Sequence, residues 1–373
     1  MLLQRLALAN FKNIEGADLA FSPKINCFLG NNGMGKSNLL DAIYVLSYCR
    51  SFTGASDPLL LRRDSDFATL HATYRRRDVD EELTIGMRRG QRKILHRNGK
   101  AYPRLADHLG AFPAVLLSPA DMDLTAGEPS ARRRFIDQIS SQRDARYLDT
   151  LVRYNSLLEQ RNRLLRDGST ESTLYDVLDM QLEAAADYLE ERRRTDIAAL
   201  EALFTPYYTH IAGNAELATL RYVSADYSAE GGLAAHLAAT RGRDLALKHT
   251  ASGPHRADIE FCVDGLPVRR TASQGQAKTF TTALRFAQYD LLRRSIGVTP
   301  LLLLDDIFDK LDADRVDRIV DTVAHSDTFG QIFITDTNRR HLDETIATMD
   351  AAGDYRLWQV EHGAFTPIES SQP

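Results

Sequence analysis

A single short segment, residues 30–37, constrains the fold of this 373-residue chain more than any other feature of the sequence. It reads Gly-Asn-Asn-Gly-Met-Gly-Lys-Ser and matches the pattern GxxxxGK[ST] in full. The apolar stretch Ile25–Leu29 predicts a buried strand before it, and residues 36–50 have the apolar spacing of a helix. A glycine-rich turn between a strand and a helix is typical of phosphate-binding loops, or P-loops, in α/β folds. The alternative is a turn that holds no ligand.

The residue types in this loop suit a bound nucleoside triphosphate with Mg²⁺. Glycines let backbone N–H groups converge on phosphate oxygens, and the following helix adds the partial positive charge of its N-terminus. We expect Lys36 to reach the β- and γ-phosphates and the Ser37 hydroxyl to bind Mg²⁺. The predicted ATP-binding residues of the loop are Gly30, Asn31, Asn32, Gly33, Met34, Gly35, Lys36, Ser37 and Asn38.

Two acidic residues after an apolar run complete the expected site. Leu301–Leu304 predicts a buried strand, and Asp305 and Asp306 follow directly. A parallel strand here places Asp305 at the edge of the sheet beside the phosphates, where it is expected to bind Mg²⁺. Asp306 is the candidate base that polarises an attacking water, and it joins Lys36 as a predicted catalytic residue. The alternative is a strand that ends in a solvated acidic turn.

A second candidate phosphate contact opens a later predicted helix, which covers residues 275–294. Ser273-Gln274-Gly275-Gln276 stand at its start. Ser273 is a favourable N-cap, which alone can explain the serine. The exposed N–H groups of the helix start and the Ser273 hydroxyl also suit a phosphate, so both interpretations stay open.

The pattern of apolar residues predicts an α/β domain interrupted by a helical insertion. Residues 1–128 and 248–373 read as α/β, with Tyr355–Val360 as an edge strand, and residues 129–247 read as an all-helical arm domain. The chain contains no run of about 18 apolar residues, so we expect neither a membrane span nor a membrane partner. Three widely spaced cysteines and a start without signal-peptide features favour a cytoplasmic location.

The order of these motifs resembles that of ABC-type ATPase heads, and further stretches narrow the resemblance. Residues 8–13, Leu-Ala-Asn-Phe-Lys-Asn, are similar to the LxNFRN opening of the SMC-like DNA-repair branch. Residues 119–137, 252–258 (Ser-Gly-Pro-His-Arg-Ala-Asp) and 305–312 are similar to stretches of the RecF family. The resemblance covers nearly the whole chain.

The resemblance implies roles for the motifs and for partners. Ser273–Gln276 would be the signature motif, which contacts the γ-phosphate bound by a partner subunit, and Lys12 would supply the cation of the opening motif. Two copies would form an ATP-dependent homodimer that binds DNA without sequence preference, near gaps or junctions between single-stranded and duplex DNA. The implied protein partners are RecR and RecO, and the implied outcome is the loading of RecA.

Three positions depart from the usual ABC pattern. Asp306 stands where many of these ATPases have Glu, and its shorter side chain favours slow hydrolysis. Residues 114–118 contain no glutamine for a Q-loop, and no histidine follows the strand at 332–335. Sensing of the γ-phosphate would therefore fall to Thr335 or another residue. Leu311-Asp312 resembles the D-loop.

Basic residues crowd the β-rich segment 67–104, although the formal net charge of the whole chain is −5. This cluster is either a DNA-binding surface or a solvated, ion-paired sheet edge, and the sequence leaves both open. Arg132–Arg134 and Arg192–Arg194 lie in the helical part, where a solvated face is the simpler interpretation. The turn Pro254-His255-Arg256 is either structural or linked to the site.

Three other functions remain as alternatives. A transporter subunit would need a Q-loop and a switch histidine, and an SMC-like DNA tether would need long runs of heptads. An ATPase–nuclease of the overcoming-lysogenization type would need an added acidic nuclease domain. The sequence offers none of these features, so we expect a DNA-repair ATPase.

Overall fold

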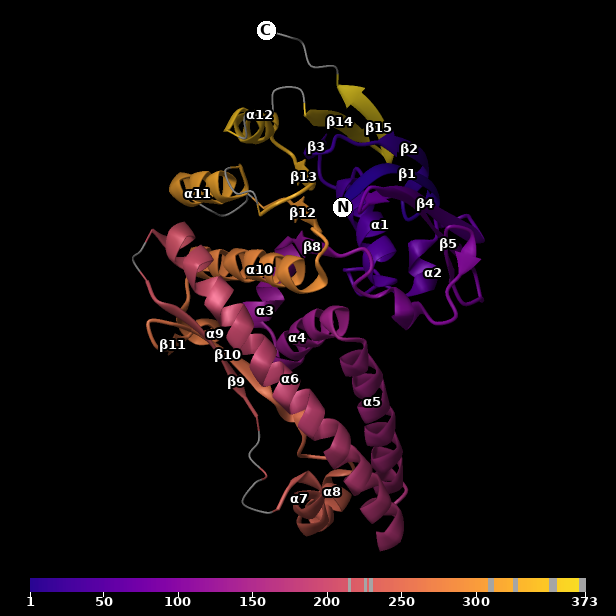
Figure 1. Cartoon of the computed structure of the whole chain (residues 1–373), viewed down its shortest axis with the longest axis vertical. Coiled ribbons are helices and arrows are strands. Elements are labelled where there is room, and N and C mark those ends of the chain that lie inside the picture. The colour runs from indigo at the N-terminus through magenta and orange to yellow at the C-terminus, as the bar shows by residue number, and fades with distance from the viewer. Residues whose placement is uncertain are drawn as a thin grey trace. The chain divides into compact units, whose positions relative to one another are not determined.

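The computed structural model describes residues 1–213, 216–224, 227, 231–307, 312–324, 328–348 and 354–368. The chain divides into two compact units, shown in Figure 1. Residues 1–122, 207–215 and 273–373 form one, called here the head unit, and residues 123–206 and 216–272 form the other, the arm unit. The predicted domain limits at residues 129 and 247 stay a prediction; the compact units differ from them chiefly in placing residues 248–272 with the arm.

A mostly parallel sheet with strand order β15-β14-β3-β13-β12-β8 organises the head unit. All neighbouring strands in it are parallel except β14 and β15. Its interior strands are apolar runs because helices or a second sheet cover both faces. The prediction that the strand at 355–360 lies at an edge is wrong, because β14 has β3 on one side and β15 on the other. The strands are β3 (Ile25–Leu29), β8 (Ala114–Leu117), β12 (Leu301–Asp305), β13 (Ile332–Asp336), β14 (Tyr355–Glu361) and β15 (Ala364–Ile368).

A second, antiparallel sheet with order β2-β1-β4-β5-β6-β7 belongs to the same unit. Its strands alternate buried and solvent-facing residues, as a sheet with one covered face requires. A tight hairpin at Asn98-Gly99 joins β6 to β7, and both residues have positive φ, as such turns require. The strands are β1 (Leu2–Phe11), β2 (Ile14–Ala20), β4 (Phe67–Arg76), β5 (Val79–Arg88), β6 (Ile94–Arg97) and β7 (Lys100–Ala101).

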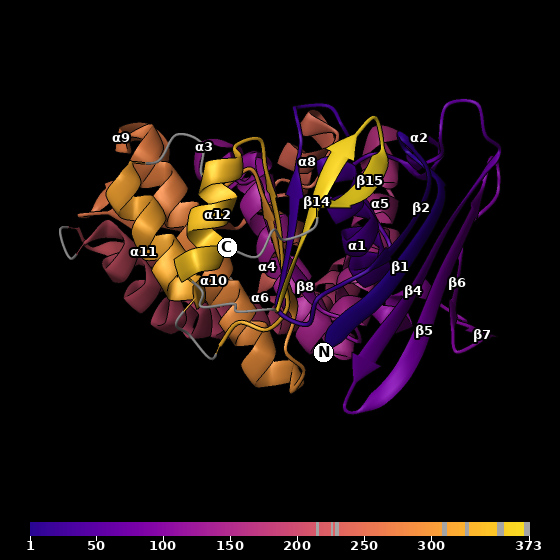
Figure 2. The same cartoon turned by 90° about the horizontal axis from the view of Figure 1, so that it is seen from above.

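Helix α1 lies between the two sheets, where it contacts β4 on one side and β8, β12 and β13 on the other (Figure 2). Its position explains why nearly every one of its residues is buried. The opposite face of the parallel sheet is covered by α10, α11 and α12 (Figure 2). The helices of the head unit are α1 (Lys36–Tyr48), α2 (Asp57–Leu60), α10 (Gln274–Ile296), α11 (Ala313–Ala324) and α12 (Arg339–Thr348).

The arm unit is mainly helical, with a core of tyrosines, leucines and alanines from α5, α6 and α7. A three-stranded sheet, β11-β10-β9, also belongs to it. The all-helical prediction for residues 129–247 missed β9, although its alternation of Ala218, Leu220 and Tyr222 is a strand signal. The elements are α3 (Met122–Ala126), α4 (Pro129–Arg143), α5 (Ala145–Arg166), α6 (Ser172–Ala212), α7 (Leu233–Ala239), α8 (Arg241–Leu247), α9 (Val268–Thr271), β9 (Ala218–Val223), β10 (Asp258–Val263) and β11 (Leu266–Pro267); α3 and α6 each have one end in the head unit.

Buried ion pairs connect the helices of the arm unit. Arg161 of α5 is fully buried and donates to Asp179 of α6 at 2.7 Å and to Asp244 of α8 at 2.6 Å. Such a network is costly to break, because removal of one partner leaves an uncompensated buried charge. Among the described residues, no helix is long and apolar enough to span a membrane.

Candidate nucleotide-binding site

The loop between β3 and α1 has the backbone of an anion cradle. Gly35, the N-cap of α1, has φ of 113°, and a Cβ built there would lie 2.9 Å from Oδ1 of Asn13. Only glycine satisfies both conditions. No side chain of the described chain caps the N-terminus of α1, so its first N–H groups remain for a ligand. The geometry is that of a phosphate site at a helix N-terminus.

Lys36 is 4% exposed, and its ammonium group lies inside the loop. Nζ donates to the carbonyl of Gly30 at 2.7 Å and to that of Asn31 at 3.2 Å. Because both acceptors are neutral, the positive charge of Lys36 stays available to phosphate oxygens in the same loop. Asn31, Asn32 and Gly33 are exposed.

Asp305 meets the P-loop at the C-terminal end of β12. The Ser37 hydroxyl donates to its Oδ1 at 2.8 Å, and the Thr335 hydroxyl donates to the same oxygen at 2.7 Å. Burial raises the pKa of Asp305, while these two hydrogen bonds oppose the shift. The Ser37 hydroxyl and the Asp305 carboxylate are thus adjacent oxygen donors, the ligand type that Mg²⁺ prefers. They fit a Mg²⁺ ion bound together with phosphate oxygens, and among the described residues no cluster of three or more His, Cys, Asp or Glu side chains is arranged to hold a metal alone.

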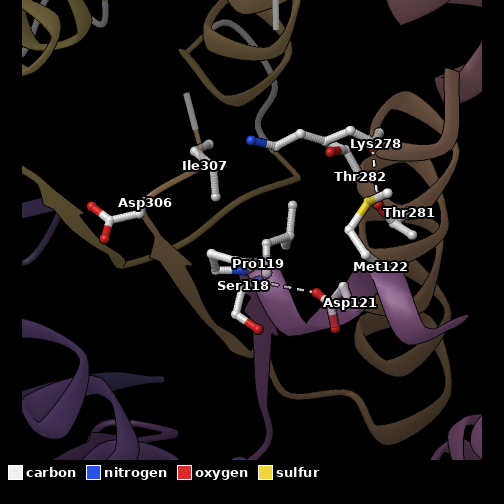
Figure 3. Close-up of a pocket in the computed structure, with 10 residues that line it drawn as sticks. Ser118, Pro119, Asp121, Met122, Lys278, Thr281, Thr282, Asp306 and Ile307 are labelled. Atoms are coloured by element: carbon white, nitrogen blue, oxygen red, sulfur yellow. Dashed lines mark hydrogen bonds between the residues drawn. The ribbon is translucent and has the colours of Figure 1, made fainter. Parts of the chain in front are cut away.

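Asp306 follows with a left-handed backbone conformation, φ 46°. Its N–H donates to the carbonyl of Thr335 at 3.3 Å and to the Thr335 hydroxyl at 3.2 Å. Figure 3 shows its carboxylate pointing away from Ser118 and Asp121. Positive φ in a residue other than glycine is uncommon and clusters at functional sites.

The expectation that Thr335 senses the γ-phosphate stays a prediction. Its hydroxyl is buried and bonded to Asp305 and to the N–H of Asp306. Thr337, two residues later, is exposed and lines a pocket together with Gly30 and Asn31 of the P-loop. This neighbour was not singled out from the sequence, although it lies on the same turn.

The opening motif packs against α1 beside the loop. Lys12 forms an ion pair of 2.5 Å with Asp41, a fully buried residue of α1. Asn38 donates to Oδ1 of Asn13 at 2.7 Å, which ties the motif to the first turn of α1. The sequence analysis missed Asn13 and Asp41 as neighbours of the site, although Asn13 is part of the quoted motif and Asp41 is an acidic residue within an apolar helix.

The segment after β8, at the Q-loop position, forms a polar turn. Ser118 and Asp121 make a reciprocal capping box, and Asp121 accepts a charge-assisted hydrogen bond of 2.6 Å from Arg285 of α10. Together with Lys278, Thr281, Thr282, Asp306 and Ile307, these residues line the pocket in Figure 3. The turn thus joins the end of the parallel sheet to the helix that begins at Ser273.

Ser273 is exposed and caps α10. Its hydroxyl accepts from the N–H of Gln276 at 3.2 Å, and the Gln276 side chain accepts from the N–H of Ser273 at 2.8 Å. No hydrogen bond between described residues joins 273–276 to 30–38. The capping interpretation is confirmed, and the phosphate interpretation stays a prediction that needs a second subunit.

The basic β-rich segment contains ten lysines and arginines, and neighbouring carboxylates neutralise part of their charge. Six of its cations form ion pairs: Arg75 with Asp80, Arg76 and Arg97 with Glu81, Arg89 with Asp66, Lys93 with Asp57, and Arg104 with Asp107. The pairing of β4 with β5 explains two of them, because it places Arg75 directly opposite Asp80 and brings Arg76 near Glu81. The ion-paired interpretation thus holds for these six cations, and DNA binding by the segment stays a prediction.

Comparisons with known proteins agree with this architecture. The model of the RecF/RecN/SMC N-terminal domain family matches residues 2–353. The DNA replication and repair protein RecF of Parabacteroides distasonis is 46% identical over 369 residues, which cover 99% of this chain and 100% of that protein. A solved structure of the recombination mediator protein RecF with ATP, from the RecFOR pathway, has a TM-score of 0.86 at 27% identity and covers 99% of this chain and 98% of its own. The same mediator with ATPrS has a TM-score of 0.86 at 25% identity, covering 98% of both chains. The expected fold, an ABC-type ATPase head with a helical insert, is confirmed.

Proposed function

The chain belongs to the RecF family of DNA replication and repair proteins, and from this premise we propose that it is a recombination mediator whose DNA binding is switched by ATP. One observation carries the nucleotide part of the proposal: Ser37 of the P-loop and Asp305 of β12 share a hydrogen bond of 2.8 Å. This contact brings the two halves of a P-loop ATPase site together.

The P-loop would bind the phosphates through its backbone. The N–H groups at the start of α1 would donate to phosphate oxygens, and Lys36 would exchange its neutral carbonyl partners for the β- and γ-phosphates. Gly35 permits this approach, since no Cβ intrudes between the loop and Asn13. Binding of ATP by this family is supported by the solved relative with ATP.

Ser37 and Asp305 would hold Mg²⁺, which neutralises charge on the phosphates when bound. The raised pKa of Asp305 describes a carboxylate that burial penalises, and a nearby cation would relieve that penalty. Thr335 fixes the orientation of this carboxylate through its own hydrogen bond of 2.7 Å.

Asp306 would act as the base that orients and polarises the attacking water. Its backbone is held by two hydrogen bonds from its N–H to Thr335, so the start of its side chain is fixed. An aspartate places its carboxylate nearer to its own backbone than a glutamate does. We therefore propose slow hydrolysis, in which ATP serves mainly as a dimerisation switch.

Ser273 would complete the site of a second copy of the chain. It is exposed at the N-terminus of α10, a position from which the hydroxyl and the helix dipole can face an anion on a partner. A homodimer built this way is isologous and encloses two equivalent nucleotides. ATP would favour the closed dimer because it contacts both subunits only in that state.

The closed dimer would bind DNA without sequence preference, near gaps or junctions between single strands and duplex. RecR and RecO are the proposed protein partners, and loading of RecA is the proposed outcome. These assignments rest on family membership and on relatives assigned to the RecFOR pathway.

Fluorescence anisotropy of gapped DNA tests the proposal. Binding is measured with ATP, with ADP and without nucleotide, at two salt concentrations, alongside plain duplex and single strands. We expect ATP-dependent, salt-sensitive binding by the native chain, and loss of the ATP effect in Lys36→Ala but not in the exposed control Lys24→Ala. Binding that ignores the nucleotide, or no binding to any DNA, would contradict the switch.

A further inference from the structure

Three arginines of α4 and α6 hold the turn at residues 253–258 of the arm unit. Arg193 donates to the carbonyl of Pro254 at 2.7 Å, and Arg133 donates to the carbonyl of Ala257 at 2.8 Å. Arg132 holds the carboxylate of Asp258 with two hydrogen bonds of 2.8 and 2.9 Å. The two arginine triplets of the sequence, in α4 and α6, therefore converge on this one turn.

The carboxylates beside the turn are fully engaged by two of the arginines. Asp258 is paired with Arg132, and Asp137 is paired with Arg193 through hydrogen bonds of 2.9 and 3.0 Å. Asp137 also accepts from the Tyr147 hydroxyl at 2.5 Å. Among the described residues, these two acids form ion pairs with Arg132 and Arg193, and their charges also act on Arg133 from a greater distance.

Arg133 and Arg256 are the surplus cations. No carboxylate of the described residues forms an ion pair with either of them. Arg133 bonds only to the carbonyl of Ala257, and Arg256, which is exposed, has one long hydrogen bond of 3.4 Å to the carbonyl of Thr250. Each guanidinium has five N–H donors, so most of the donors of this pair have no acceptor among the described residues.

The two surplus charges lie close enough to affect each other. Burial lowers the pKa of Arg133, and the positive charges of Arg193 and Arg256 lower it further, while the carboxylates of Asp258 and Asp137 oppose the shift only in part. Arg133 is also bonded to the residue that directly follows Arg256 in the chain. An anion placed against both guanidinium groups would relieve this repulsion.

The backbone that carries the pair is rigid. Gly253 has φ of 132°, and a Cβ there would lie 2.6 Å from the Tyr154 hydroxyl. His255 contacts the Tyr154 hydroxyl through Nδ1 at 2.7 Å and the carbonyl of Thr250 through Nε2 at 3.0 Å. A turn fixed on both sides presents its charges without a large ordering cost on binding.

We propose that Arg133 and Arg256 form a binding site for the phosphodiester backbone of DNA, which deepens the DNA-binding part of the proposed function and rests on it. Guanidinium groups match the geometry of phosphate oxygens, and contacts to phosphates carry no sequence information.

The test is the salt dependence of duplex binding with ATP present. The double variant Arg133→Gln/Arg256→Gln removes the pair, and Arg163→Gln/Arg166→Gln removes two exposed arginines of α5 with the same change in net charge. The slope of log K against log salt is negative, and each lost phosphate contact is expected to lower its magnitude by about 1. We therefore expect the magnitude to fall by about 2 in the first variant and to change little in the second. Arg133→Lys/Arg256→Lys should restore most of the slope, because the slope counts charges, with weaker binding at low salt.

Arg256→Gln alone is the variant least able to disturb folding, because the one hydrogen bond of Arg256 to a described residue is long. It should lower the magnitude of the slope by about 1. ATP turnover and the unfolding temperature show whether each variant keeps its head and its fold. If Arg133→Gln/Arg256→Gln and Arg256→Gln both keep the native salt slope, while the native chain binds DNA as proposed, the site is overturned and the proposed function stands. A native slope with loss of binding to a polyglutamate peptide would assign the pair to an acidic protein partner instead. Absence of DNA binding by the native chain would overturn both proposals.

Discussion

The Ser37 hydroxyl lies 2.8 Å from Oδ1 of Asp305, although 268 positions separate the two residues in the sequence. Parallel pairing of β3, β13 and β12 produces this contact, because it brings the C-terminal ends of the three strands to one edge. The same oxygen also accepts a hydrogen bond from Thr335. A carboxylate that is buried, oriented and close to a P-loop serine is arranged for ligand binding at a cost in stability.

Asp305→Asn should stabilise the nucleotide-free protein while abolishing Mg²⁺-dependent ATP turnover. The folded-state pKa of Asp305 is raised, so its charged form destabilises the fold as pH rises through that pKa. An amide removes the buried charge and keeps an oxygen acceptor for Ser37 and Thr335. We expect the unfolding temperature at pH 8 to rise by about 2 °C or more, with the gain shrinking as pH falls below the raised pKa. A fall in unfolding temperature together with intact turnover would contradict this role.

Asp306→Asn should bind ATP and stall. The variant loses the proposed base, so turnover should fall by about 10²-fold or more while nucleotide affinity stays native. The expected product is a long-lived, ATP-bound dimer, visible as doubled mass in light scattering. Asp314→Asn, on the exposed first turn of α11, is the matched control and should behave as the native chain. Native turnover in Asp306→Asn would assign the base elsewhere.

Ser273→Arg should leave ATP binding by each subunit intact and prevent ATP-dependent dimerisation. Loss of the N-cap costs about 1 kcal/mol, which is small enough for the head to fold. Ser273→Asp separates the two effects, because aspartate keeps the cap but repels a phosphate. Thr170→Arg, exposed in the α5–α6 connection, controls for added charge. Normal dimers of both Ser273 variants would refute the composite site.

His255→Gln should reduce the acid sensitivity of the protein. Burial lowers the pKa of His255 to about 4, and its Nε2 donates to the Thr250 carbonyl, so Nδ1 accepts from Tyr154. The stability that neutral His255 contributes is present above pH 6.5 and is lost as pH falls from there toward 4, which amounts to about 3 kcal/mol. Denaturant unfolding across this range should show a shallower pH slope in the variant.

His108 of the head unit serves as a second histidine for comparison, because burial also lowers its pKa to about 4. His108→Gln should remove a similar share of the slope, and the double variant should remove both. An unchanged slope in His255→Gln would mean that this histidine binds its proton in the folded state.

Much of the site could be predicted from local sequence patterns. Features that depend on strand pairing between distant parts of the chain could not. The strand, loop and helix around residues 25–48 are determined mainly by residues close together in the sequence, so the local motif was enough to predict them. β9 pairs with β10 across about 35 residues, and its short alternation was lost within a helical stretch. The buried position of β14 depends on β15 and β3, which no local pattern of residues 355–360 reveals.

The ion pairing and burial of charged side chains were the properties that the sequence predicted least well. For the arginines of β4 the sequence left a basic surface and an ion-paired edge both open, whereas the folded chain pairs Arg75 with Asp80 and Arg76 with Glu81 of β5. The arginines of α4 and α6 seemed solvated, yet Arg132 and Arg193 are buried. Which cations are neutralised depends on partners that only the folded chain brings near.

The strand order of the head unit also determines when β3 can pair with its neighbours during synthesis. Both neighbours of β3, β13 and β14, lie roughly 300 residues later in the chain. At the usual rate of synthesis by a bacterial ribosome, this delay is about 15–60 seconds. During that time the apolar strand β3 has no neighbouring strand with which to form backbone hydrogen bonds. Unpaired apolar strands are prone to aggregate. We therefore expect ribosome-stalled chains that end before residue 332 to bind chaperones, which crosslinking on the ribosome would detect. A premature stop codon, even near the C-terminus, would remove a neighbour of β3 and thereby weaken the ATP binding that depends on the P-loop.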